Sequence, residues 1–383
     1  MPSALHALLP RPRLREIDHV AVATPPEQTW KVVRGSDLYD VRMVRALFAA
    51  RTLPERVGDW LRGSAFAAAP RSAYLDDIVG EGSGFHCLAD VPGHEFVAGA
   101  IGQFWKPQIP FVPTSPATFR GFDEPGFGKV AWSLQVHPRA GGGSWITFDL
   151  RVDATDDDAW RSFLPYWALI GRFSRLIRRV LLRHLAERLG SPTGDSERAL
   201  AGDDILANAG ISRTDSILID APPWAVWPWL VQMGARRGGW YGIDALENGG
   251  VASAPQVIPE LQHIAIGDIV PAAPTSDSGF AVLAVAPARH LVLGSPRLLS
   301  SSRQSWPPTT GVLGARYDVT WAFVLEPVGE DATRLAVRVR ATPPPSLTTE
   351  VVRPALLAVH GVMERAQLRN LKRRAEELAQ QHT

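Results

Sequence analysis

The stretch Gly238–Asn248 holds the side chains best suited to contact a ligand. Its glycines permit close approach of the backbone, and the rings of Trp240 and Tyr241 combine flat apolar surface with a polar tip. Asp244 follows at a distance that lets its carboxylate turn toward the same ligand. A packed turn whose carboxylate caps a helix fits the pattern as well, and for Asp244 it is the favoured interpretation. For the two rings both interpretations stay open.

Histidine supplies little chemistry in this chain. Its ten histidines are scattered, with no HxH or HExxH pair and no carboxylate at metal-ligand spacing, so we predict no metal site. His360, in the apolar part of a predicted closing helix, is the one histidine that invites a test as an acid or base. Signatures of a serine nucleophile, a phosphate loop and a dinucleotide fold are also absent, since Gly141–Gly143 is a hairpin turn with no helix behind it. We therefore expect no cofactor.

Four arginines form a basic row on the predicted helix 160–189, at the 3-4-4 spacing that places them on one face: Arg172, Arg175, Arg179 and Arg183. Such a row could meet phosphates or anionic lipid. However, the apolar residues of the same helix are expected to pack on a core, and a packed helix needs a solvated face. A simple solvated face is the favoured interpretation.

The elements that position these residues occur twice. Ala23–Val33 and Ile219–Leu230 both run from the end of a strand through two prolines to a tryptophan four residues later. Proline suits the first helical turn, so each copy predicts a strand that passes directly into a helix. Farther on, Trp132 falls on Trp321 at an offset of 189, and the match continues without a gap to Leu189 and Leu378. The chain is a duplicated domain.

Alternation in the late strands predicts which sheet face looks inward. Trp132 shares a face with Leu134 and Val136, and its copy Trp321 shares a face with Phe323. We expect these apolar sets to face a closing helix and to line any cavity. The opposite sets are polar and are expected to face water: Ser133, Gln135, His137, Thr147, Asp149, Arg151, Thr320, Glu326, Arg334, Arg338 and Arg340. The alternative is that the apolar side chains fill the interior completely.

Composition narrows the class of protein. The 383 residues carry a net charge of +1, which gives no general reason to expect nucleic acid as a partner. One cysteine fits a reducing compartment, and the prolines and arginines of the first residues do not match a signal peptide. No apolar run is long enough to span a membrane. A cytoplasmic protein is expected, and a homodimer is left open.

The order of strand, two helices, antiparallel strands and one long terminal helix resembles the START-like superfamily, also called SRPBCC, which includes polyketide cyclases and relatives of the birch-pollen allergen. The residues that carry the resemblance are Ala23–Trp30 and Asp220–Trp227 for the strand-to-helix passage, Trp132 and Trp321, and the closing helices Phe173–Leu189 and Met363–Leu378. It implies an α+β fold of two tandem helix-grip domains, 14–189 and 211–380, joined by a linker at 190–210. In each, a curved antiparallel sheet wraps on the terminal helix.

Three functions follow from this resemblance. The first is binding of an apolar or aromatic small molecule, predicted in the second domain because the first lacks the glycine–aromatic motif. The predicted ligand-binding residues are Trp240, Tyr241, Trp321, Phe323 and Trp132. The second is an enzyme of the polyketide cyclase or aromatase kind, with acid–base residues Tyr241, Asp244 and His360. The third is a non-catalytic structural or partner-binding tandem. Whether the protein is an enzyme is left open.

Overall fold

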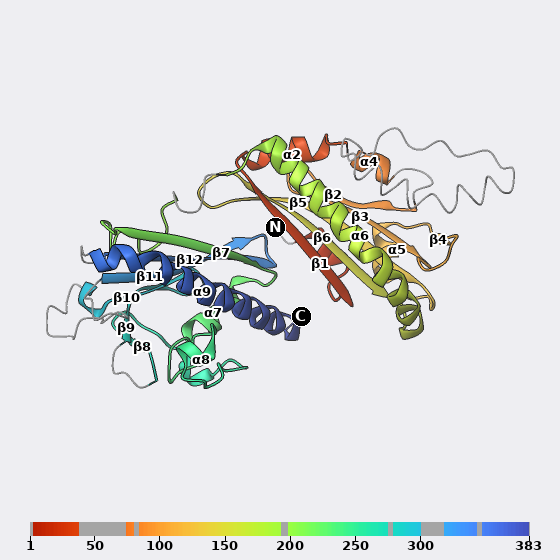
Figure 1. Cartoon of the computed structure of the whole chain (residues 1–383). Coiled ribbons are helices and arrows are strands. Elements are labelled where there is room, and N and C mark those ends of the chain that lie inside the picture. Colours follow the sequence, from red (N-terminus) through yellow and green to blue (C-terminus); the bar gives the residue numbers. More distant parts are fainter. Residues whose placement is uncertain are drawn as a thin grey trace. The chain divides into compact units, whose positions relative to one another are not determined.

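The computed structural model describes residues 3–37, 74–79, 84–192, 198–274, 279–299, 318–342 and 347–382. The chain divides into two compact units, residues 1–192 and 193–383. Each unit is α+β and contains an antiparallel sheet of six strands and a long C-terminal helix (Figure 1). The second of the two helices expected after the first strand falls at residues 41–48, which lie outside the described residues.

The first unit has the strand order β1-β6-β5-β3-β2, and β4 pairs with β3. Its described elements are α1 (Ala4–Leu8), β1 (Leu14–Val22), α2 (Pro26–Arg34), α4 (Leu75–Ile78), β2 (His86–Val91), β3 (Glu95–Gly102), β4 (Phe111–Val112), α5 (Pro116–Gly121), β5 (Gly128–Pro138), β6 (Ser144–Ala154) and α6 (Asp157–Leu189).

The second unit has the order β7-β12-β11-β10-β9-β8. Its described elements are β7 (Ile211–Ile219), α7 (Pro223–Val231), α8 (Asp244–Glu247), η2 (Pro259–Leu261), β8 (Ile269–Pro271), β9 (Gly279–Ala286), β10 (His290–Gly294), η3 (Pro296–Leu298), β11 (Asp318–Val328), β12 (Ala332–Thr342) and α9 (Leu347–Gln381). Trp132 pairs with Leu150, and Trp321 pairs with Val339. The offset of 189 residues is therefore also the structural register of the duplication.

The strand-to-helix passage forms as predicted in both units. α2 begins at Pro26 and α7 at Pro223, each preceded by a second proline in extended conformation. A proline there loses no hydrogen bond, because the first N–H groups of a helix have no intrahelical acceptor. Trp30 is buried in the first core, whereas in the second unit Trp229 and Leu230 take the deeper positions.

The main core of each unit lies between the sheet and its closing helix. In the first unit Trp132 and Leu134 pack with Leu181 and Leu185 of α6. In the second unit Phe323 and Leu325 pack with Leu368 and Leu371 of α9. The prediction that the apolar strand faces look toward the closing helix is confirmed, and the helix-grip architecture with it.

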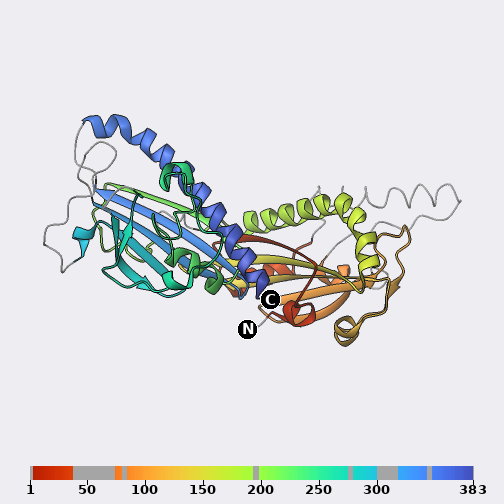
Figure 2. The same cartoon turned by 90° about the horizontal axis from the view of Figure 1, so that it is seen from below.

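The prediction that the other sheet face meets water is wrong in the first unit. A segment that we call strap 1 (residues 3–13) crosses that face and includes α1, so α6 and α1 lie on opposite sides of the sheet (Figure 2). Leu5 and Leu8 pack against Val97 beneath it. Because both sides are covered, every residue of β3 is buried.

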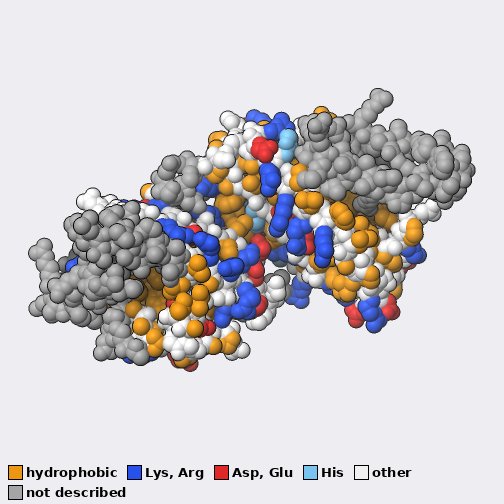
Figure 3. Space-filling model, viewed as in Figure 1, with side chains coloured by type: hydrophobic (Ala, Val, Ile, Leu, Met, Phe, Trp, Pro, Cys, Tyr) orange, Lys and Arg blue, Asp and Glu red, His pale blue; other side chains and the backbone are white. Residues whose placement is uncertain are grey.

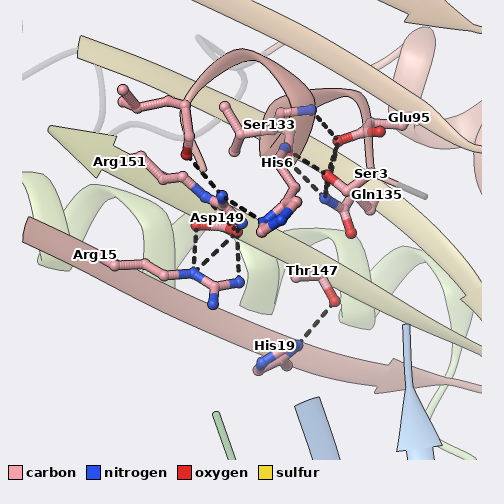
Figure 4. A network of polar contacts seen from close by, with 12 residues as sticks. Ser3, His6, Arg15, His19, Glu95, Ser133, Gln135, Thr147, Asp149 and Arg151 are labelled. Atoms are coloured by element: carbon pink, nitrogen blue, oxygen red, sulfur yellow. Dashed lines mark hydrogen bonds and ion pairs between the residues drawn. The ribbon is translucent and has the colours of Figure 1, made fainter. Parts of the chain in front are cut away.

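The polar residues under strap 1 form a hydrogen-bonded network (Figure 4). The carboxylate of Glu95, fully buried, accepts hydrogen bonds from Ser3 Oγ at 2.8 Å and from the backbone N–H of Ala4 at 2.6 Å. Arg151, 1% exposed, donates to Asp149 and to the carbonyl of Leu9. These contacts satisfy charges that would otherwise be costly to bury.

The second unit buries its polar face in the same way. Strap 2 (residues 198–210), which lies in the predicted linker, runs as consecutive turns before β7. Arg338 is 2% exposed, pairs with Asp203 and donates to the carbonyl of Arg198 at 2.8 Å. Arg340 donates to the carbonyl of Leu206, as Arg151 donates to that of Leu9 in the first unit. The straps are thus part of the duplication.

The apolar stripe predicted on the helix 160–189 is only partly buried. Leu181 and Leu185 lie in the core, but Leu169 and Phe173 are exposed. Pro165 lies within α6 and removes a hydrogen bond from its first half, and Figure 2 shows the helix bent in that region.

Candidate functional site

The glycine–aromatic motif lies in a loop of the second unit whose backbone requires its glycines. Gly234 and Gly239 form an isolated antiparallel bridge. Gly239 has φ of +83°, and a Cβ at this position would lie 2.4 Å from Ser253 Oγ. This close turn directs two side chains inward, so that Trp240 is 3% and Tyr241 1% exposed. The motif is therefore part of the core of the unit.

Trp240 belongs to a layer of aromatic rings on the inner face of the sheet. Its indole stacks on Trp321 at a centroid distance of 5.3 Å and 19° between the planes, and it meets the edge of Phe280 at 5.8 Å. Trp321 in turn contacts Phe323 at 5.0 Å. The indole N–H of Trp240 donates to the carbonyl of Ala272 at 3.1 Å. The structure thus brings together three predicted ligand-binding residues.

Tyr241 joins that layer to α7 and α9. Its ring meets Trp229 edge to face at 5.9 Å, and the guanidinium of Arg374 lies 4.8 Å from its centroid. The phenol oxygen accepts a hydrogen bond from Gln232 Nε2 at 2.5 Å. Burial raises the pKa of the phenol above its ordinary value of 10.0. Tyr241 therefore stays protonated at neutral pH and could act only as a hydrogen-bond donor or an acid.

A polar row on α9 holds the loop in place. Gln367 Nε2 donates to the carbonyl of Trp240 at 2.7 Å, and Asn370 Nδ2 donates to that of Tyr241 at 2.9 Å. One turn later, Arg374 Nε donates to the carbonyl of Ala254 at 3.2 Å. Because these bonds satisfy the backbone of the loop, the loop and the closing helix form one packed layer.

Asp244 binds the loop rather than an open space. Its carboxylate accepts from the N–H of Ser253 at 3.1 Å and from its hydroxyl at 2.6 Å. Glu247 accepts from the N–H of Ile243 at 3.0 Å, at the start of α8. Burial, aided by the charge of Asp244, raises the pKa of Glu247 to about 7. Both contacts match the interpretation that the carboxylates stabilise a turn.

A hollow of about 200 Å³ lies at the C-terminal end of α9, beside Trp229. Its wall combines apolar surface with charged and amide groups, contributed by Trp229, Pro255, Gln256, Val257, Arg374, Glu377, Leu378 and Gln381. The indole N–H of Trp229 is buried and has no hydrogen-bond acceptor among the residues described. The hollow is smaller than a typical site for a drug-sized ligand, so it suits a small molecule or one end of a larger one.

A pair of carboxyl groups lies farther toward the start of α9. Asp215, on the helix-facing side of β7, accepts from Arg213 Nε at 2.5 Å. Glu364 of α9 is 2% exposed, and its Oε2 lies 3.9 Å from the same nitrogen. Burial and the adjacent Asp215 raise the pKa of Glu364 to about 8, while the Arg213 hydrogen bond holds the pKa of Asp215 below its usual value. The pair therefore retains a proton at neutral pH, on Glu364.

The first unit has the opposite charge at one of the two equivalent strand positions and the same charge at the other. Strand register equates Glu16 and Asp18 of β1 with Arg213 and Asp215 of β7. Across from them, Arg178 of α6 pairs with Glu16 and donates to Asp18 at 2.9 Å, and Arg175 also pairs with Glu16. Glu16 thus stands where the second unit has Arg213, and Arg175 of the helix stands where it has Glu364, whereas Asp18 and Asp215 are both acids. In the first unit each of the two carboxylates therefore has a cationic partner.

Two predicted residues lie apart from this constellation. Trp132 stacks on Phe148 at 5.4 Å in the core of the first unit. His360 lies on α9, but its side chain is outside the described residues. The sequence analysis missed Asp215, Glu364 and Arg374. The sequence did contain a sign that Asp215 faces the interior, since it shares a strand face with the apolar Ile217 and Ile219.

Two absences hold for the residues that the structure describes. No group of three or more His, Cys, Asp or Glu side chains is arranged to hold a metal ion. No helix among the described residues has the length and apolar character needed to cross a bilayer.

Comparison with known proteins gave matches only among solved structures. No family model and no curated protein matches the chain. The di-domain ARO/CYC BexL of the BE-7585A biosynthetic pathway is 14% identical, with 95% of this chain and 99% of that chain covered and a TM-score of 0.24. The di-domain ARO/CYC StfQ of the steffimycin pathway is 13% identical, with 95% and 98% covered and a TM-score of 0.26.

The Zhui aromatase/cyclase from Streptomyces sp. R1128 is 10% identical and matches one part of the chain, with 43% of this chain and 93% of that chain covered and a TM-score of 0.22. The assignment of the fold rests on the strand order, the register and the closing helices of the chain itself. On these grounds the protein is a tandem of two helix-grip units.

Proposed function

We propose that the second unit binds a small apolar or aromatic molecule carrying an acceptor oxygen. The observation that carries this proposal is the hollow beside Trp229. Its apolar wall, formed by Trp229, Val257 and Leu378, favours a hydrophobic ring, while Arg374 supplies a cation at the same place. Behind the wall, Arg374 and Trp229 both contact Tyr241, so two of the lining residues are held by the aromatic core of the unit.

Burial of one ring against this wall would contribute about 1–3 kcal/mol through apolar area alone. That corresponds to weak binding unless the guanidinium of Arg374 adds a charge-assisted hydrogen bond. Burial lowers the pKa of Arg374, because desolvation disfavours its charge. An acidic group on the ligand would offset this desolvation cost by pairing with the charge of Arg374.

The test is a fluorescence titration of the full chain with 1-anilinonaphthalene-8-sulfonate, which carries both an aromatic surface and an anion. Leu378→Gln and Arg374→Gln should each weaken binding about tenfold, the effect of roughly 1.4 kcal/mol. Arg373→Gln is the matched control, since this neighbouring arginine is exposed and pairs with Glu377 across one turn. Equal affinity in all four proteins would remove the hollow from the proposal and favour a non-catalytic structural or partner-binding tandem.

A catalytic role of the polyketide cyclase or aromatase kind has one observation of its own. Glu364 is a buried acid that holds a proton near neutral pH beside Asp215 and Arg213, as general acids require. If it transfers protons, turnover of a synthetic poly-β-ketone should fall by at least two orders of magnitude in Glu364→Gln and should change with pH around 8 in the parent protein. Turnover equal to that of the parent would exclude the carboxyl pair from any reaction.

A further inference from the structure

The outward face of α6 exposes a row of large apolar side chains. Leu169 is 66%, Phe173 48% and Leu176 41% exposed. Their spacing of four and three residues places them on one side of the helix, away from the sheet-facing Leu181 and Leu185. Contiguous exposed apolar side chains of this size mark an interaction surface more often than a scattered leucine does.

The basic row runs directly beside this apolar row. Arg172, Arg175, Arg179 and Arg183 are all exposed and span 12 residues, with a rise of about 17 Å from the first to the last. No acidic residue occurs from 159 to 186. Arg175 and Arg179 contact carboxylates of β1, but Arg172 and Arg183 form no ion pair within the described part of the chain. Figure 3 shows blue and orange side chains side by side along α6.

We propose that this face of α6 docks the first unit on a lipid bilayer that contains anionic phospholipids. Leu169, Phe173 and Leu176 would enter the boundary between headgroups and acyl chains, and the arginines would lie at the phosphates. A helix with apolar and basic rows side by side is the arrangement by which helices lie in that interface. The surface is the outward face of a single helix, which suits a fluid layer of headgroups.

Charge excludes the obvious alternative of a second copy of the chain. Two α6 helices packed through their apolar rows would bring Arg172 and Arg183 of both copies together, and these arginines have no acid on either helix between 159 and 186 and no ion pair in the described part of the chain to compensate them. Like charges in contact oppose association. An anionic partner removes this repulsion and turns it into attraction.

The experiment is sedimentation of the full chain with phosphatidylcholine vesicles that contain either no phosphatidylserine or about one third of it. We expect binding only to the anionic vesicles, and weaker binding at higher salt. Each arginine near an anionic surface contributes about fivefold in affinity, so Arg172→Gln with Arg183→Gln should weaken binding about 25-fold. Leu169→Gln with Phe173→Gln should weaken it by a similar factor at all salt concentrations.

Matched controls come from exposed positions of the second unit. Leu246→Gln replaces a leucine that is also 66% exposed, and Arg369→Gln replaces an exposed arginine of α9. Both should bind vesicles like the parent protein. The proposal is overturned if the parent does not sediment with anionic vesicles, if it sediments equally with neutral ones, or if the α6 variants match the controls. A dimer in analytical ultracentrifugation that Leu169→Gln with Phe173→Gln abolishes would also overturn it.

Discussion

Replacing Glu364 by glutamine should change how the stability of the protein depends on pH. The substitution keeps the size of the side chain and fixes it in the neutral state that the carboxyl group adopts beside Asp215. In the parent protein the pKa of this group moves from the ordinary 4.5 to about 8 on folding, chiefly because the side chain is buried. The native state therefore holds a proton that the unfolded state has already lost between these two pH values.

This bound proton sets the direction in which the unfolding free energy changes with pH. The contribution of Glu364 is fully present below about pH 4.5 and is lost as the pH rises to about 8, because the unfolded state is then the form that gains from ionisation. A shift of this size corresponds to a loss on the order of 4 kcal/mol across the window, shared in part with Asp215. Glu364→Gln has no such proton to lose. Its unfolding free energy should approach that of the parent at pH 5 and exceed it by several kcal/mol at pH 9.

The assay is urea unfolding of both proteins from pH 5 to pH 9, with the difference in unfolding free energy plotted against pH. Glu377→Gln is the control, since this acid of α9 is half exposed and pairs with Arg373. Its difference from the parent should change by less than 1 kcal/mol over the same range. A flat difference for Glu364→Gln would refute the reasoning, because it would mean that the carboxyl group is ionised in the folded protein at neutral pH.

Other predictions concern the cores and the straps. Trp132→Ala should lower the unfolding free energy of its unit by about 3–5 kcal/mol in urea titrations, since it empties a buried aromatic site, and Trp321→Ala should cost somewhat less because Trp321 is only partly buried; unchanged midpoints in both would contradict the assigned core. Asp203→Ala should cost about 3–5 kcal/mol because it leaves Arg338 buried without its carboxylate. The adjacent and exposed Asp204 gives the control, and Asp204→Ala should stay within about 0.5 kcal/mol of the parent.

The repeat, the strands and the closing helices could be predicted from the sequence because they depend on local patterns. Two prolines predict the start of a helix, and alternating apolar residues predict a strand, from a window of only a few residues. Alternation, however, distinguishes the two faces of a sheet without saying what covers either of them. Arg151 and Arg338 were expected in water, yet each is buried by a strap that lies far from it in the sequence.

The composition of strap 2 led us to predict a linker rather than a segment that covers the sheet. Glycine and aspartate in 198–210 are typical of a linker, but Asp203 and the carbonyls around it serve as acceptors for buried arginines. The linker at 190–210 therefore stays a prediction, while the two compact units divide between residues 192 and 193. The candidate site was predicted in part. Trp240 and Trp321 lie together as predicted. The pKa of Glu364, by contrast, is raised by burial and by Asp215, which lies on a strand about 150 residues earlier in the sequence.

The charge difference between the two repeats, at Glu16 and Arg213 on the strands and at Arg175 and Glu364 on the closing helices, favours packing of each helix on its own sheet during folding. Because the strands of both units pair in the same register, either closing helix could in principle pack on either sheet. If α6 docked on the wrong sheet, Arg175 and Arg178 would meet Arg213. If α9 did so, Glu364 would meet Glu16 and Asp18. Exchange of equivalent elements is the characteristic misfolding of duplicated chains. In its own unit each helix instead has a partner of opposite charge, Glu16 for Arg175 and Arg213 for Glu364, and an exchange would lose both pairs, so these pairs favour each helix on the strand of its own repeat.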